Sequence, residues 1–199
     1  MNGKKVMEEK ENLKWEAGAE GSGHPLASFR YCPRCGGRSF VVYDDRAKRC
    51  EGCGFTYYMN SAASVVAVVV NGKGELLLSR RAYEPARGCL DLPGGFVNLD
   101  ESLEDAVKRE FKEETGGDVE IVRWLFSLPN RYVYSGLSIA TTDSFFLCRL
   151  RDGAGLRAGD DVAELLWIGL DEIDTKKIGL SSIRKGVEML VADRKLVRM

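Results

Sequence analysis

The sequence contains a single histidine, His24, among 199 residues. Catalytic triads and imidazole bases need a histidine held inside the fold, whereas His24 lies in a polar N-terminal stretch. We therefore do not expect histidine-based hydrolysis. A side-chain base in this chain would be a carboxylate.

Long apolar runs and an excess of either charge are also missing. The chain has 29 basic and 30 acidic residues, and no hydrophobic run approaches the length of a membrane span. The sequence has no signal-peptide pattern. We therefore expect a cytoplasmic protein with no membrane partner. The balanced charge argues against a nucleic-acid partner, and a homodimer is compatible with this composition.

The composition predicts three segments. With 44% hydrophobic residues, the chain can bury one good core and a small satellite. Residues 1–29 are charged and Gly-rich, which predicts a polar leader. Residues 30–59 hold four clustered cysteines and predict a small metal-bound module, and residues 60–199 form the expected catalytic domain.

An acidic face on a predicted helix is the most informative feature of the chain. At 3.6 residues per turn, three apolar residues and three glutamates fall on one face about 100° wide. These residues are Leu103, Ala106, Val107, Glu110, Glu113 and Glu114. The opposite face already carries solvent-facing charges, so a purely solvated role for the glutamates fits poorly.

The ends of this helix make the acidic face costly. Ser102 with Asp105 predicts an N-cap, and Gly116-Gly117 predicts the C-terminal end. Glutamates in the last turn oppose the negative end of the helix dipole and repel one another, each effect costing roughly a few tenths of a kcal/mol. A hard divalent cation such as Mg²⁺ or Mn²⁺ would offset both effects.

A tight loop precedes the helix. Leu90 and Leu92 alternate as in a strand, and Pro93-Gly94-Gly95 ends that strand. Because this loop is nearly free of side chains, its backbone carbonyls can approach a cation closely.

Residues 95–116 are similar to the signature of the Nudix hydrolases. The matching positions are Gly95, Glu101, Arg109-Glu110-Phe111, Glu113-Glu114 and Gly116. The resemblance implies an α-β-α sandwich with a mixed sheet, of the α/β (α+β) class, and a metal-dependent attack of water on a diphosphate linkage. Gly117 departs from the signature, which has an aliphatic residue there, and we expect weaker packing at the helix end.

The resemblance also implies roles for individual residues. Glu110, Glu113 and Glu114 would hold the catalytic Mg²⁺ or Mn²⁺, with a carbonyl of Gly94 or Gly95 as a further ligand. Arg109 with Glu101 would brace the loop and the helix. Glu114 or an acid from another loop would orient the attacking water.

Four cysteines predict a second metal site. Cys32 and Cys35 form one CxxC pair, Cys50 and Cys53 form another, and 14 residues (36–49) separate the pairs. This spacing is typical of four-cysteine zinc sites, whose filled tetrahedral shell makes the Zn²⁺ structural. A disulfide is disfavoured in a reducing cytosol. The intervening residues predict a short hairpin, so the module is expected to be a zinc ribbon.

Basic residues in the ribbon raise the alternative of nucleic-acid binding. These residues are Arg34, Arg38, Arg46, Lys48 and Arg49. Nearby acids partly balance them, and aromatic residues interleave with them only thinly. The sequence therefore favours a structural ribbon.

The catalytic domain shows several strand patterns. Residues 64–70 and 75–81 are nearly continuous apolar runs around Asn71-Gly72, which predicts a hairpin buried on both faces. Further strands are predicted within 119–128, 143–150 and 164–170. A last helix should begin near Ser181 and cover the sheet through Ile183, Val187, Leu190 and Val191.

A zinc ribbon ahead of a Nudix domain narrows the resemblance to the NADH pyrophosphatase group and its relatives that act on ADP-ribose or FAD. Of the run that follows the signature in that group, only Ser127 and Pro129 match.

Two sets of residues are candidates for substrate binding. Asn130, Tyr132 and Tyr134 could stack on and hydrogen-bond a base, or could be ordinary strand residues. Arg80 and Arg81 could meet phosphate, or could be exposed charges at a strand end.

Three functions follow from this reading. The favoured one is hydrolysis of a dinucleotide or ADP-ribose-type substrate (NADH, NAD⁺, ADP-ribose or FAD), which gives AMP and a second monophosphate. The second is removal of a nucleotide cap from RNA, with the ribbon steering the RNA. The third is a non-enzymatic nucleotide sensor, against which the intact set of costly glutamates argues.

Overall fold

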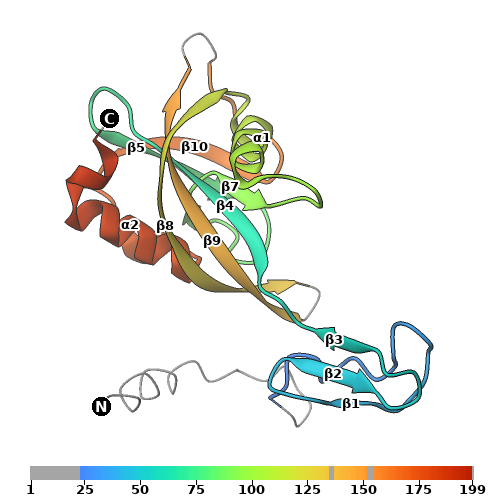
Figure 1. The fold of residues 1–199 in the computed structure, drawn as a ribbon. Coiled ribbons are helices and arrows are strands. Elements are labelled where there is room, and N and C mark those ends of the chain that lie inside the picture. The colour runs from blue at the N-terminus through green and yellow to red at the C-terminus, as the bar shows by residue number, and fades with distance from the viewer. Residues whose placement is uncertain (1–22, 135–136, 152–154, 199) are drawn as a thin grey trace, which may run out of the picture. The chain divides into compact units, whose positions relative to one another are not determined.

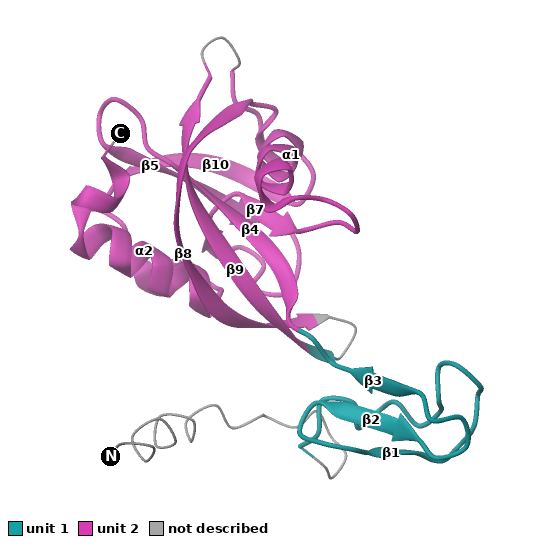
Figure 2. Cartoon of the chain, in the orientation of Figure 1, with its two compact units in different colours: residues 1–60, 136–138 teal, residues 61–135, 139–199 magenta. Residues whose placement is uncertain are grey.

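The computed structural model describes residues 23–134, 137–151 and 155–198. The chain divides into two compact units, residues 1–60 with 136–138 and residues 61–135 with 139–199 (Figures 1 and 2). Most of the predicted leader, residues 1–22, lies outside the described residues. The first unit ends one residue beyond the boundary that the sequence predicts.

The first unit is built on a three-stranded sheet of order β1-β2-β3. Its strands are β1 (Phe40–Val42), β2 (Ala47–Cys50) and β3 (Thr56–Tyr58), and both pairings are antiparallel. The hairpin predicted between the two cysteine pairs is therefore confirmed. The small core consists of Cys32, Phe40 and Cys50, with Phe29, Cys53 and Phe55 packed against it.

The second unit contains two sheets. One has the order β7-β4-β9-β8, and the other has the order β10-β5-β6. The strands are β4 (Ala62–Val69), β5 (Glu75–Arg81), β6 (Leu90–Asp91), β7 (Gly94–Phe96), β8 (Val119–Tyr134), β9 (Leu137–Leu150) and β10 (Val162–Gly169). Strand β4 runs parallel to β9 and antiparallel to β7, so the first of these sheets is mixed, as predicted.

The predicted hairpin of β4 and β5 is wrong. A single bridge, between Val70 and Leu76, joins these segments, and the strands then separate into different sheets. A strand has two hydrogen-bonding edges. One edge of β4 pairs with β9 and one edge of β5 pairs with β10, whereas the second edge is taken by β7 at residues 64–66 of β4 and by β6 at residues 79–80 of β5, so a hairpin cannot extend along the two strands. A turn does form at the predicted place, but it spans residues 72–74, since Asn71 N donates to Glu75 O at 3.0 Å.

Burial on both faces of β4 and β5 is confirmed. Successive side chains of a strand point to opposite faces, so Val66 and Val68 join one core whereas Val65 and Ala67 join another. The first core contains residues of α2 (Ser181–Ala192), and the second contains residues of α1 (Leu103–Thr115). The helices lie on opposite sides of the strands (Figure 1), which confirms the predicted sandwich.

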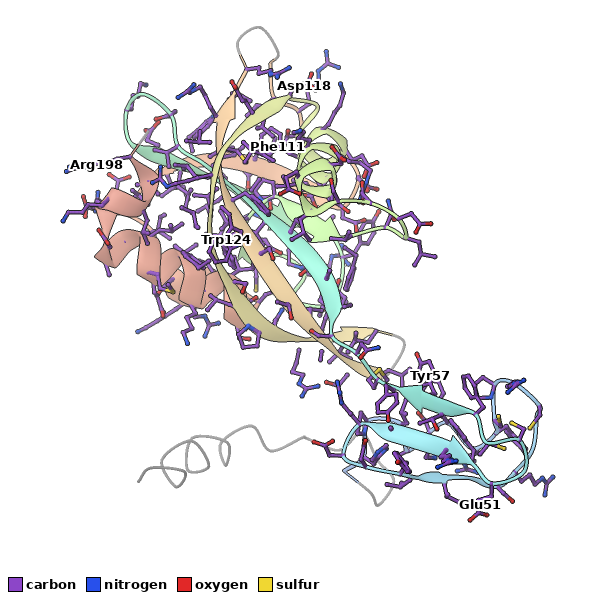
Figure 3. The ribbon with its side chains drawn as sticks, viewed as in Figure 1. Glu51, Tyr57, Phe111, Asp118, Trp124 and Arg198 are labelled. Carbon is purple, nitrogen blue, oxygen red and sulfur yellow. The ribbon has the colours of Figure 1, made fainter. Side chains whose placement is uncertain are left out.

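Helix α1 has the predicted ends. The Ser102 hydroxyl accepts a hydrogen bond from Asp105 N at 3.1 Å, and Gly116 forms the C-cap with φ 69°. Phe111, labelled in Figure 3, is fully buried between this helix and the strands. The expected loosening at Gly117 is wrong, because a Cβ there would come within 2.6 Å of Leu156, which already fills the space.

Two short 3₁₀ helices, η2 (Thr175–Lys177) and η3 (Arg194–Val197), flank α2. The predicted apolar face of α2 is confirmed, since Ile183, Val187 and Leu190 are buried and Val191 packs against the same core. Within the described residues, no helix is both long and apolar enough to span a bilayer.

Candidate active site

A cavity of about 310 Å³ opens in the second unit, between α1, the loop around β7 and the N-terminal end of α2. Seven carboxylates line it: Asp91, Glu110, Glu113, Glu114, Asp143, Asp160 and Asp161. Arg81, Asn130 and Tyr132 line it as well. One cavity therefore brings together the predicted acidic helix face and three of the five predicted substrate residues.

The acidic end of the cavity depends on the close approach of α1 to β7. A Cβ on Gly95 would come within 2.5 Å of Glu110 Oε2. A Cβ on Gly94 would collide with the backbone of Val65 on β4. Glycine is therefore required at position 94 for the pairing of β7 with β4, and at position 95 for the close approach of Glu110.

Arg109 holds the acidic residues in place. Its guanidinium donates to Glu101 Oε1 at 2.7 Å, to Glu110 Oε1 at 2.8 Å and to Glu113 Oε2 at 2.9 Å. It also donates to Phe96 O on β7 at 3.0 Å. These hydrogen bonds lower the pKa of Glu101 to about 2, so its carboxylate stays charged and ties the loop to the helix.

Glu114 is the most deeply placed of the three helix glutamates. Gly94 N donates to its Oε2 at 3.0 Å. Burial, reinforced by the nearby charges of Asp91 and Glu110, nevertheless raises the pKa of Glu114 to about 8. Burial also raises the pKa of Glu110, against the lowering effect of Arg109. A cation near these carboxylates would favour their charged forms.

The donor set fits a hard divalent cation. Glu110, Glu113 and Glu114 offer carboxylate oxygens to one cavity, and Gly94 and Gly95 line it beside them. Mg²⁺ and Mn²⁺ prefer such oxygen ligands and keep positions for water and phosphate. Glu113 is 48% exposed, so one side of the site is open to solvent.

Arg81 and Tyr132 also line the cavity. Arg81 donates to Asp91 Oδ2 at 2.6 Å and to the Tyr132 hydroxyl at 3.2 Å. The Tyr132 ring meets Phe96 edge to face, with centroids 5.5 Å apart. Arg81 is thus a half-buried cation held by Asp91. We call the neighbouring pair of rings, Phe96 and Tyr132, the aromatic rim.

Asp91 and Asp143 line the cavity but are not among the site residues that the sequence predicts. Asp91 lies on β6 and Asp143 on β9, and both are buried. Asp143 accepts hydrogen bonds from the hydroxyls of Ser64, Thr141 and Ser182, which come from two strands and a helix. The signal that could have identified them is an aspartate within a strand of apolar residues. Such a carboxylate is buried, and a buried carboxylate needs hydrogen-bonding partners.

The remaining predicted substrate residues are placed differently. Asn130 is buried, and its Oδ1 accepts from Ser181 Oγ at 2.9 Å. Arg80 does not line the cavity; it pairs with Glu164 at 2.9 Å and donates to Gly88 O, because alternate residues of β5 face opposite ways. The side chain of Tyr134 lies outside the described part of the chain.

The four cysteines of the ribbon form a second cluster. Their Sγ atoms all lie within 4.8 Å of one another, with 3.7 Å both between Cys32 and Cys53 and between Cys35 and Cys50. None is in a disulfide. Four thiolates at this spacing fit a tetrahedral Zn²⁺ and leave no open position, so the zinc is structural.

The basic residues of the ribbon lie beside aromatic rings. Four cation–ring pairs are present: Arg38 with Tyr31, Arg46 with Tyr58, Lys48 with Phe40, and Arg49 with Tyr43. The expectation of thin aromatic interleaving is therefore wrong. The tyrosines come from separate segments that only the folded sheet brings next to the arginines.

Comparison with known families agrees with this geometry. The NUDIX domain model matches residues 60–187, and the NADH pyrophosphatase zinc ribbon domain model matches residues 27–58. The chain belongs to the Nudix family. Nudix enzymes use Mg²⁺ or Mn²⁺, which agrees with the carboxylates in the cavity, and act on small nucleotide-derived substrates.

Curated proteins named NAD-capped RNA hydrolase NudC resemble this chain. An NAD-capped RNA hydrolase NudC of Vibrio atlanticus is 32% identical over 143 residues, which cover 72% of this chain and 49% of that protein. One of Haemophilus influenzae is 34% identical over 107 residues, covering 53% and 40%. The chain spans about half the length of the curated relatives that it matches.

Solved structures share the fold. A NUDIX hydrolase from Nitrosomonas europaea superposes with a TM-score of 0.67 at 25% identity, covering 83% of this chain and 92% of that one. A MutT NUDIX hydrolase from Burkholderia pseudomallei gives 0.56 at 26% identity, covering 65% and 97%.

Proposed function

We propose that this chain hydrolyses the diphosphate linkage of a dinucleotide or ADP-ribose-type substrate, such as NADH, NAD⁺, ADP-ribose or FAD. One observation carries the proposal: Glu110, Glu113 and Glu114 line the same cavity as Arg81 and Tyr132. The products would be AMP and a second monophosphate. Water supplies the oxygen and the protons, and one bridging P–O bond breaks.

In this proposal, Glu110, Glu113 and Glu114, with Gly94 or Gly95, hold Mg²⁺ or Mn²⁺. When bound, the metal neutralises the diphosphate charge and lowers the pKa of its water. Arg109 and Glu101 keep the helix and the loop at a fixed separation. Arg81, held by Asp91, faces the cavity with a positive charge suited to a phosphate oxygen.

The base that takes the proton from the attacking water is a carboxylate. Glu114 is the first candidate, since Gly94 N donates to its Oε2 at 3.0 Å and orients it, and a bound cation would keep its carboxylate charged and able to accept a proton. Asp160 and Asp161 are the loop acids of the cavity. Their loop is fixed against the helix, because Gly159 N donates to Glu114 O at 2.9 Å.

The aromatic rim would receive the base of the substrate. Tyr132 is fixed by Phe96 and Arg81, so a base can stack on a ring that is already oriented. Asn130, buried at the inner wall, would contribute amide hydrogen bonds.

Removal of a nucleotide cap from RNA is the second candidate. The observation that favours it is the name of the curated relatives, NAD-capped RNA hydrolase NudC, since a capped RNA presents the same diphosphate linkage. In either case we propose a cytoplasmic protein with a zinc ribbon over residues 30–59 and a catalytic domain over residues 60–199. A homodimer is part of this proposal and is tested by sedimentation.

The test is a substrate panel with Mg²⁺ or Mn²⁺. NADH, NAD⁺, ADP-ribose, FAD and a 5′-NAD-capped RNA would be supplied separately, and the monophosphates released would be quantified by chromatography. We expect AMP from at least one dinucleotide and none from the Glu113→Gln/Glu114→Gln variant. Turnover of capped RNA alone would favour the second candidate. Tight nucleotide binding without turnover of any substrate would identify a sensor.

A further inference from the structure

One face of the ribbon sheet carries an ordered set of tyrosines and arginines. Directly paired residues of antiparallel strands share a face, so Val41, Arg49 and Thr56 lie together, as do Ala47 and Tyr58. Ala47 and Arg49 are two residues apart on β2 and share that same face. With Tyr43 and Arg46, which contact Arg49 and Tyr58, these residues define the outer ribbon face.

The opposite face holds the ribbon together. Phe40 and Cys50 lie there in the core, and Lys48 donates to Phe29 O at 2.8 Å. Tyr57, labelled in Figure 3, stacks on Phe29 with centroids 6.3 Å apart. Because the core and the cysteines lie on this side, the tyrosines and arginines of the outer ribbon face lie outside the zinc-binding core.

The two tyrosines of the outer ribbon face are exposed and held in place. Tyr43 is 55% exposed and Tyr58 is 39% exposed. The Arg49 guanidinium lies 5.7 Å from the centroid of the Tyr43 ring, and the Arg46 guanidinium lies 5.4 Å from that of Tyr58. Ala47, the cross-strand partner of Tyr58, is fully buried. Each ring is thus held in a fixed orientation by a guanidinium that lies over one of its faces.

We propose that the outer ribbon face binds single-stranded nucleic acid. Unpaired bases stack on aromatic rings presented by a sheet, and adjacent arginines pair with the phosphates between them. The two oriented rings, one at the end of β3 and one directly after β1, suit two or three nucleotides. Apolar protein interfaces are depleted of charge at their centre, whereas Arg49 lies on the central strand here. Asp44 and Asp45 border one end and would keep the phosphates toward the arginines.

The test measures binding without hydrolysis, so that it is independent of the proposed reaction. Fluorescence anisotropy of a labelled, uncapped 12-nucleotide oligouridylate would be followed with zinc-loaded full chain and no added Mg²⁺ or Mn²⁺. We expect Tyr43→Ala/Tyr58→Ala to weaken binding at least about tenfold, and Tyr43→Phe/Tyr58→Phe to bind like the wild type, because stacking needs only the ring. An oligothymidylate of equal length shows whether DNA binds equally.

The arginines provide a second, independent variant. Arg46→Gln/Arg49→Gln should weaken binding and reduce the slope of log affinity against log salt by roughly 1.4, since two phosphate contacts to a single strand are lost. Zinc content and melting temperature show whether each variant is folded. If Tyr43→Ala/Tyr58→Ala loses zinc, the binding of Arg46→Gln/Arg49→Gln tests the proposal instead. The matched control is Trp124→Ala, which removes a 55% exposed aromatic residue from β8 in the other unit (Figure 3).

Three outcomes would overturn the proposal. They are no binding by the wild type, equal loss in the Trp124 control, and unchanged binding in both ribbon variants. A change of oligomeric state in the ribbon variants, with unchanged anisotropy, would assign this face to a second copy of the chain instead.

Discussion

The carboxylate of Glu110 lies directly against the backbone of Gly95, where a Cβ would come within 2.5 Å of Oε2. Arg109 fixes the other oxygen of Glu110 at 2.8 Å, so the carboxylate is held from two sides. The loop of β7 can therefore approach helix α1 this closely only because residue 95 has no side chain. Their separation sets where the acidic group stands in the cavity.

Gly95→Ala should displace Glu110 and lower kcat by at least ~10-fold, because a small misplacement of a catalytic group has a large effect. The metal concentration for half-maximal activity should rise. The control is Gly72→Ala, where a Cβ would meet no atom of the described residues within 4 Å. Steady-state kinetics against Mg²⁺ concentration checks the pair, and equal kcat values would contradict a role for the close approach.

Glu114→Gln should lower kcat by at least ~100-fold, since it removes both a metal ligand and the leading candidate base. Above about pH 8, where Glu114 is charged, the metal-free variant should be as stable as the wild type or more so, because a buried carboxylate is replaced by a neutral amide. Glu104→Gln, an exposed position on the same helix, is the control. Wild-type turnover at saturating Mg²⁺ would remove Glu114 from the reaction.

The raised pKa of Glu114 predicts a pH dependence of stability. Its folded pKa of about 8 exceeds the ordinary value of ~4.3, so between these values the folded state holds a proton that the unfolded state releases. This contribution is fully present below about pH 4 and is lost as the pH rises through 8. In metal-free buffer, the melting temperature of Glu114→Gln relative to the wild type should therefore rise from pH 5 to pH 8.5.

Added Mg²⁺ should reverse this trend in the wild type. The cation binds the charged carboxylates, so it should raise the melting temperature more at pH 8.5 than at pH 6. Glu114→Gln should respond less at both values. A variant-to-wild-type difference that is flat across this range would show that Glu114 titrates at an ordinary pKa.

The sequence alone predicts those features of the fold and the site that depend on residues close together in the chain. Ser102 and Gly116 mark the ends of α1 because capping is a local property of the chain. The cysteine spacing likewise identified the sulfur cluster, since four ligands at fixed intervals constrain a small module strongly. In both cases the residues involved lie close together in the sequence.

Features that depend on strand pairing were not accessible in this way. The sequences of β4 and β5 are typical of a hairpin, and only the pairing of β4 with β7 and β9 shows that the two strands belong to different sheets. Asp143 acquires its partners from three segments, and the most distant partner, Ser64, is 79 residues away in the sequence. Arg80 and Arg81 are adjacent in sequence, yet only Arg81 faces the cavity, because the register of β5 decides which one points inward.

Cys50→Ser should release zinc and unfold the ribbon, because metal binding supplies most of the folding free energy of so small a module. Cys50 is buried beside Phe40, so little apolar core remains without the metal. Elemental analysis and limited proteolysis of the first unit check this expectation. Cys148→Ser, a buried cysteine of the second unit, is the control and should keep its zinc. Wild-type protein purified without zinc would contradict the assignment.

Tyr132→Ala tests whether the aromatic rim belongs to the substrate site or to the core. Tyr132 is half-buried, lines the cavity and accepts a hydrogen bond from Arg81, so we expect it to contact the substrate. The KM for an adenine-containing substrate should rise about tenfold, as expected for a lost stacking partner, with little change in melting temperature. Tyr132→Phe keeps the ring and should retain most of the affinity. If melting instead falls by several degrees while KM holds, the ring is a packing residue for Phe96, and the base must bind elsewhere in the cavity.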